Sequence, residues 1–244
     1  MESFKIINNI ILASVLEPIP EKKGCTTRNK DWQDKSKLEY FLIAGVNIST
    51  AFNELIIRIV DNNYKQPPLI YDLAYKAQNL SLKNRFGGKV NFGIIELLIP
   101  IVATQIIYQD FDITVLDKVE NVLKNTTKED VRWHLKFREL ARSVSKKLPN
   151  VNYYDVKNMY EYYRIDKNNQ ENDIHNEYIE KFSRIKEAYN ILSNDFQDGE
   201  LLNRSVIAYD TIIEKCNNYY GLAADYICVA IYLYLSKYPD SIII

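Results

Sequence analysis

The sequence is poor in the residues that usually mark turns or carry nucleophilic and metal chemistry. Its 244 residues include seven glycines, seven prolines, three cysteines and two histidines. Cys25, Cys216 and Cys228 lack the close spacing of a zinc knuckle, and a disulfide framework is not expected from thiols so far apart. No glycine-rich phosphate loop and no Ser-His-Asp arrangement occurs, so covalent catalysis has no support in the sequence.

A surplus of one charge sign and a long hydrophobic run are also lacking. Lys and Arg number 31 against 32 Asp and Glu, and a formal net charge of −1 gives no overall field to attract nucleic acid or anionic lipid. The uncharged runs 40–53 and 97–109 are shorter than the ~20 residues that span a bilayer. The first 16 residues contain Glu2 and Lys5 and show no signal-peptide cleavage site. We expect a soluble cytoplasmic protein with reduced thiols and with no nucleic-acid or membrane partner.

Apolar residues recur at helical spacing along almost the whole chain. No strand pattern, internal repeat or low-complexity segment competes with this period. The sequence therefore predicts an all-α protein of about eight to ten helices, folded as a single compact domain over residues 1–244.

Local signals place several helix boundaries. Pro67 and Pro68 should end the long helix that begins near residue 38, because proline cannot donate to the helical hydrogen-bond ladder. Pro100 should kink or restart the apolar helix over residues 94–108. Thr126 and Glu129 have the spacing of a capping box, which predicts a helix over about residues 127–146.

The polar loop over residues 18–36 is long enough to be functional. Lys22, Lys23 and Arg28 supply cations, and Gly24 would let the backbone approach a ligand closely, as a triphosphate requires. A solvated charged loop is the alternative. If the loop binds a triphosphate, removing the Lys22 charge should weaken nucleotide binding and leave folding unchanged.

Polar residues also stand at the start of the apolar helix. Asn91 and Gly93 lie where free backbone N–H groups favour a phosphate, although Asn91 could be an N-cap only. Glu96 interrupts the apolar run; a buried carboxylate needs a partner or a metal, and an exposed position would explain it equally well. Asp173 and Glu177, four residues apart, could bind magnesium or face solvent.

The histidines and tyrosines have ordinary interpretations. Neither His134 nor His175 has a second histidine or a cysteine at metal-ligand spacing, and His134 is interpreted as a packed or surface residue rather than a base. The 19 tyrosines could stack on an adenine ring or belong to the core. The tyrosines of the last helix also suggest a homodimer contact.

Three fragments occur in an order that resembles the triphosphoribosyl-dephospho-CoA synthase family, in particular its short archaeal-type members. They are residues 16–24 (LEPIPEKKG), 90–100 (VNFGIIELLIP) and 238–242 (YPDSI). The family pattern has a Glu before a Lys-Pro-Gly-Asn turn, an Asn-Thr-Asn-Leu-Gly segment and a Pro-Asp-Thr-Leu segment. This sequence has Lys23 and Cys25 in place of the Pro and the Asn of that turn.

The resemblance implies a divergent transferase that binds ATP as substrate with Mg²⁺ and displaces adenine. The triphosphoribosyl group would pass to an acceptor, dephospho-CoA by default. The alternative is a catalytically inactive family member that acts as a helical binding or scaffold protein, because the first motif is altered. The resemblance implies Glu17 and Asp240 as catalytic and metal-binding residues, and Lys22, Gly24, Asn91 and Gly93 as nucleotide-binding residues.

Overall fold

The computed structural model describes residues 3–31, 37–84, 90–144, 154–167, 174–194 and 200–238. Within these ranges the chain is helical and contains no β-strand, only an isolated bridge between Thr27 and Lys30. The all-α prediction is confirmed. The helices are α1 Ser3–Leu16, α2 Leu38–Asn47, α3 Ser49–Asp61, α4 Tyr71–Ser81, α5 Phe92–Tyr108, α6 Val119–Lys124, α7 Lys128–Val144, α8 Met159–Lys167, α9 His175–Ile179, α10 Ser183–Leu192, α11 Leu201–Ile213 and α12 Tyr220–Lys237, with 3-10 turns at Ile113–Lys118 and Glu214–Cys216.

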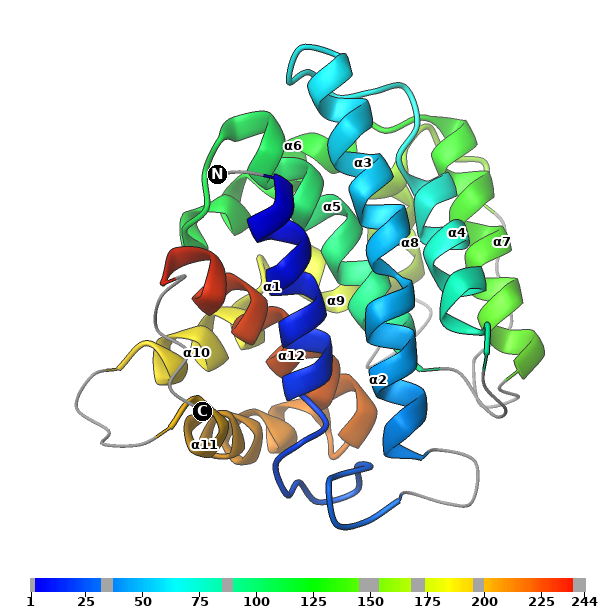
Figure 1. Cartoon of the computed structure of the whole chain (residues 1–244). Helices are drawn as coiled ribbons and strands as arrows, with labels where there is room; N and C mark the ends of the chain where they lie inside the picture. The colour runs from blue at the N-terminus through cyan, green and yellow to red at the C-terminus, as the bar shows by residue number, and fades with distance from the viewer. Residues whose placement is uncertain are drawn as a thin grey trace.

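Two helices, α5 and α12, form the centre of the core. Every residue of α5 from Phe92 to Ile106 is buried, and α12 is buried without interruption from Tyr226 to Ser236. A helix that is apolar on all sides is stable in water only when other elements cover it. Helices α3, α4, α6 and α12 pack against α5, and α1 lies beside α12, so the first and last helices are neighbours (Figure 1).

Helices α2 and α3 stand end to end and form one column, joined at Ile48 (Figure 1). By length and composition, Leu38–Asp61 is the one continuous helical segment among the described residues that could cross a membrane. In this structure the column packs against α1 and α4. On α3, the guanidinium of Arg58 pairs with Glu54 at 2.7 Å and with Asp72 of α4 at 2.8 Å.

A single buried apolar cluster includes side chains from every helix except α2. This continuity supports one domain, and the assignment of that domain to residues 1–244 stays a prediction.

The three cysteines are all free thiols, in agreement with the expected absence of a disulfide framework.

The capping box of α7 is one residue away from its expected position. The reciprocal pair is Thr127 with Asp130 instead of Thr126 with Glu129: the Thr127 N–H donates to Asp130 Oδ2 at 2.9 Å, and the Asp130 N–H donates to Thr127 Oγ1 at 3.3 Å. The other oxygen of the buried Asp130 carboxylate accepts two backbone N–H groups at the start of α4, at 2.8 and 3.0 Å. One carboxylate therefore caps two helices, which local spacing does not reveal.

Helix α5 continues through Pro100, so the helix does not restart there. Proline has no N–H, and the carbonyl oxygen four residues earlier, that of Glu96, loses its helical partner. The hydroxyl of Tyr178 on α9 donates to this oxygen at 2.6 Å. The contact between α9 and α5 therefore replaces the hydrogen bond that Pro100 removes.

Tyr178→Phe should destabilise the protein by about 1–3 kcal/mol, because it leaves a buried carbonyl without a donor. In a Pro100→Ala background the restored backbone N–H can bond that carbonyl, so the same substitution should have a smaller effect. Urea unfolding of the four proteins in a double-mutant cycle measures the difference. Equal losses in the two backgrounds would show that Tyr178 does not compensate for the proline.

Candidate functional site

The loop that follows α1 is fixed by α11 and α12. Gly24 has a φ of +74°, in the left-handed region that glycine adopts without strain. A Cβ at this position would also lie 2.1 Å from the ring of Tyr220, the first residue of α12. On α11, the hydroxyl of Tyr209 donates to the carbonyl of Lys23 at 2.6 Å and lies 3.4 Å from the sulfur of Cys25. Gly24 is thus required for close packing as well as for its backbone conformation.

Glu17 and Lys22 form a buried ion pair at the base of this loop. Lys22 Nζ lies 2.9 Å from Glu17 Oε1 and also donates to the backbone carbonyl of Glu17. Neither side chain is more than 5% exposed. Removing one partner would leave an uncompensated charge out of water. The expectation that the loss of the Lys22 charge leaves folding unchanged is not compatible with this geometry.

A hollow of about 400 Å³ opens beside the ion pair. This volume lies within the usual range for small-molecule sites. Lys23 and Lys30 are exposed at its rim and give it a positive edge. The lining residues are Glu21, Lys22, Lys23, Gly24, Cys25, Thr27, Lys30 and Tyr220.

Asn91 occupies the N-cap position of α5 in a left-handed conformation, with a φ of 57°, but its side chain makes no capping hydrogen bond. The amide oxygen and nitrogen of this side chain are both buried and have no partner within the part of the chain that the structure describes. Buried amides nearly always have partners. An unpartnered amide at the start of a 17-residue helix therefore points to a ligand.

Gly93 connects this helix start to α12. A Cβ on Gly93 would lie 2.1 Å from Oδ2 of Asp225, so only glycine allows the carboxylate to approach. Sequence reasoning missed Asp225; the available signal was a single acidic residue in the otherwise apolar helix Tyr220–Lys237.

One glycine of each of the first two motifs therefore packs against the first two turns of α12. Tyr220 contacts Gly24, and Asp225, five positions later, contacts Gly93. Burial, with the nearby carboxylates of Glu17 and Asp225, raises the pKa of the Cys25 thiol. The carboxylates of Glu17 and Asp225 therefore both lie close enough to the Cys25 sulfur to raise its pKa. Of the other predicted acidic residues, Asp240 and Asp173 lie outside the described residues, whereas Glu177 is buried and pairs with Arg184 at 2.8 Å instead of facing solvent.

A second polar cluster lies inside the core, one helical turn beyond Gly93. Oε1 of Glu96 is 2.7 Å from Nε2 of His134 and 2.8 Å from Nε2 of His175. All three side chains are fully buried, and one ligand atom from each lies within 4.8 Å of the others. His134 was expected to be packed or at the surface, and it is packed; Glu96 takes the buried alternative. The sequence did not reveal that the two histidines share one carboxylate.

Burial and the close contacts within this cluster shift the pKa values of Glu96 and His134. Burial opposes ionisation of Glu96, but the two adjacent imidazoles outweigh it and hold the pKa of this carboxyl well below its usual range. Burial lowers the pKa of His134, which favours the neutral ring. Asp166 Oδ2 lies 2.6 Å from Nδ1 of His175, and Nη1 of Arg138 lies 2.8 Å from Nε2 of the same ring.

Tyrosines enclose the two histidines. The ring of Tyr162 lies 5.1 Å from that of His134, and the ring of Tyr163 lies 4.5 Å from that of His175, measured between centroids. Both tyrosines are fully buried. The core interpretation is therefore correct for these two residues, and they are not accessible to an adenine ring.

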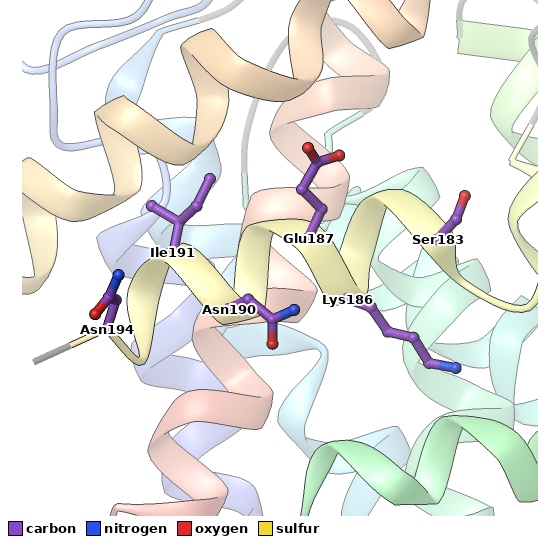
Figure 2. A pocket seen from close by; sticks show the side chains of 6 residues that line it. All are labelled: Ser183, Lys186, Glu187, Asn190, Ile191 and Asn194. Atoms are coloured by element: carbon purple, nitrogen blue, oxygen red, sulfur yellow. The ribbon is translucent and has the colours of Figure 1, made fainter.

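A hollow of about 450 Å³ also lies along α10 (Figure 2). Its labelled side chains leave the helix in different directions, with Glu187 and Ile191 on one side and Lys186 on another. Lys186 pairs with Asp117 at 2.6 Å, and Glu187 pairs with Lys215 at 2.5 Å. Because its charged groups are already paired and do not converge, this surface is a weaker candidate than the hollow beside Gly24.

A family model described as ATP:dephospho-CoA triphosphoribosyl transferase (CitG) matches residues 4–217. The matched range contains the loop with Glu17, Lys22 and Gly24 and the helix start with Asn91. It also contains the Glu–His–His cluster in the core. The comparisons with curated proteins and with solved structures gave no match.

Glu17→Gln or Lys22→Met should each destabilise the fold by about 3–5 kcal/mol, because each leaves one buried charge without its partner. The double variant removes both charges and should recover part of this loss. Urea unfolding at pH 7 measures the three changes in unfolding free energy. If the single losses simply add in the double variant, the two side chains do not act as a pair.

Cys25 should react slowly with iodoacetamide in the native protein at pH 8. Burial, together with Glu17, raises its pKa to about 11, and the thiolate is the reactive species. A cysteine of the unfolded chain has a pKa of about 8.5. The protonated Cys25 thiol therefore makes its whole contribution to the stability of the fold below about pH 8.5, and this contribution is lost as the pH rises towards 11. Mass spectrometry of Cys25 peptides from native and urea-unfolded protein measures the difference, and rapid native labelling at pH 8 would contradict it.

Proposed function

Because the chain belongs to the ATP:dephospho-CoA triphosphoribosyl transferase family, we propose that it binds ATP where α5 and α12 begin and displaces adenine. The family description supports a triphosphoribosyl transferase that uses ATP and dephospho-CoA. The observation that carries the proposal for this site is the buried, unpartnered amide of Asn91 at the start of α5. A nucleotide phosphate or ribose hydroxyl would supply the missing hydrogen bonds.

The phosphate groups require positive potential, and several features supply it. The first turn of α5 presents free backbone N–H groups and the positive end of the helix dipole. Lys23 and Lys30 add exposed ammonium groups at the rim of the hollow. In this arrangement Lys22 lines the hollow and holds Glu17 in place, while Gly24 allows Tyr220 to complete the wall.

The carboxylates are suited to Mg²⁺, which prefers oxygen ligands and usually retains several waters. Oε1 of Glu17 is held by Lys22, which limits this residue to a partial role. The Asp225 carboxylate lies beside Gly93 at the start of α5. We assign Mg²⁺ to Asp225 with a contribution from Glu17, and we retain Asp240 as a proposed ligand. The ion would neutralise charge on the triphosphate.

In the proposed reaction the bond between ribose C1′ and adenine breaks, and C1′ bonds to a hydroxyl oxygen of the acceptor. The acceptor loses its proton, and adenine leaves in protonated form. The carboxylates would stabilise the positive charge that develops at C1′, and no covalent intermediate with the protein is required. We take dephospho-CoA as the acceptor and propose a cytoplasmic location, where reduced thiols persist.

The decisive experiment is chromatographic detection of adenine released from ATP, with and without Mg²⁺ and dephospho-CoA. We expect release that depends on both. A catalytically inactive scaffold protein is the alternative, and it predicts no adenine and no thermal shift with Mg²⁺-ATP. A ligand at a hundred times its Kd should add about 2.7 kcal/mol of stability. If no adenine forms with any acceptor and no nucleotide binds, the proposal fails.

Asn91→Gly should weaken nucleotide binding about tenfold, since it removes one ligand hydrogen bond. Glycine tolerates the left-handed conformation of this position and the amide has no protein partner, so stability should not fall. Gln78→Leu is the matched control, because Gln78 of α4 is also a buried amide without a partner among the described residues. Calorimetric titration with Mg²⁺-ATP should separate the two variants; equal affinities would remove Asn91 from the site.

A further inference from the structure

We propose that Glu96, His134 and His175 form a binding site for a transition-metal ion of the Zn²⁺ class inside the helical core. The three residues come from α5, α7 and α9 and are separated by tens of positions in the sequence. The site lies apart from the hollow beside Gly24. It does not depend on whether the protein transfers a triphosphoribosyl group.

The three side chains present their ligand atoms to one point. Nε2 of His134 and Nε2 of His175 lie 2.7 and 2.8 Å from the same oxygen, Oε1 of Glu96. Zinc binds imidazole nitrogen and carboxylate oxygen at about 2.0–2.2 Å. For a tetrahedral ion at these bond lengths the ligand atoms need to separate by only roughly half an ångström more. Ordinary side-chain rotation can supply this change.

Hydrogen bonding alone leaves the cluster incompletely satisfied. The second carboxylate oxygen, Oε2 of Glu96, is buried and has no partner within the described ranges. Nε2 of His175 lies 2.8 Å from Glu96 Oε1, which needs a donor, and 2.8 Å from Arg138 Nη1, which needs an acceptor. One nitrogen cannot meet both demands. A metal ion would bind this nitrogen, both carboxylate oxygens of Glu96 and Nε2 of His134, which gives four donor atoms in total.

The surroundings resemble the support that metal-bound histidines usually have. Nδ1 of His175 lies 2.6 Å from Asp166, which fixes the tautomer that directs the Nε2 lone pair towards Glu96. Nη1 of Arg138 is 3.8 Å from Glu96 Oε1. A metal bound to Nε2 of His175 takes the lone pair to which Arg138 donates, and the Glu96 carboxylate then lies nearby as an alternative acceptor for this guanidinium.

The donor set indicates which class of metal fits. Two imidazole nitrogens and one carboxylate suit Zn²⁺ or Co²⁺, whereas Mg²⁺ requires mostly oxygen ligands and retained water. All three side chains are fully buried, so the site has no open coordination position facing solvent. The metal would therefore connect three helices as a structural ion rather than activate water.

X-ray absorption of the EDTA-treated full-length protein reloaded with Zn²⁺ tests the proposal without any substitution. The chain has two histidines, both in this cluster, so scattering from two imidazoles identifies the site. We expect one Zn²⁺ per chain with two nitrogen and one or two carboxylate ligands. No bound Zn²⁺ at micromolar concentration would overturn the proposal, and so would a zinc ion with sulfur ligands or without imidazole.

Variants give an independent measurement. Asp166→Asn removes a supporting carboxylate and should weaken Zn²⁺ binding about 10- to 100-fold, and His134→Gln should weaken it further and remove one imidazole signal. Cys25→Ser is the control and should bind Zn²⁺ as the unaltered protein does. Competition with a fluorescent zinc chelator measures each affinity, and unchanged binding in both cluster variants would contradict the assignment. These readouts stay interpretable even if no adenine is released from ATP.

Discussion

The burial of α5 is the constraint on which the rest of the structure depends. A helix without a solvent-facing side can keep polar groups only if neighbouring helices supply partners, because an unpaired polar group in the interior is unfavourable. Tyr178 bonds the carbonyl of Glu96, two histidines approach its carboxylate, and Tyr232 donates to Gln105. These contacts determine how α7, α9 and α12 sit on α5. The side-chain amide of Asn91, at the start of this helix, has no such partner among the described residues, and neither do Oε2 of Glu96 and Nε2 of Gln105.

The helical period of the sequence is enough to predict the fold class, because the burial of an apolar stripe is a local property that repeats along each helix. The groups that lie between helices are less accessible to sequence reasoning. Asp130 caps α4 as well as its own helix, which depends on how α4 and α7 pack. Likewise, His134 and His175 are 41 positions apart, and no spacing rule joins them through Glu96.

In the candidate nucleotide site, too, some residues could be predicted from the sequence and others depend on how the helices pack. The motif resemblance identified Glu17, Lys22, Gly24 and Gly93, and the structure places these residues near one end of α12. It did not identify Asp225, because this residue belongs to none of the three fragments, and its contact with Gly93 depends on how α5 and α12 pack. Nor could it show that Lys22 is buried against Glu17, since the burial of a lysine depends on the packing of the complete fold.

The contact between Gly24 and Tyr220 has a consequence for biosynthesis. The loop that follows the first helix is completed by the first turn of the last one, so residues almost 200 positions apart must meet before the hollow exists. Contacts of such long sequence separation form late, because a large loop has to close first. A nascent chain therefore has no complete site until α12 has left the ribosome.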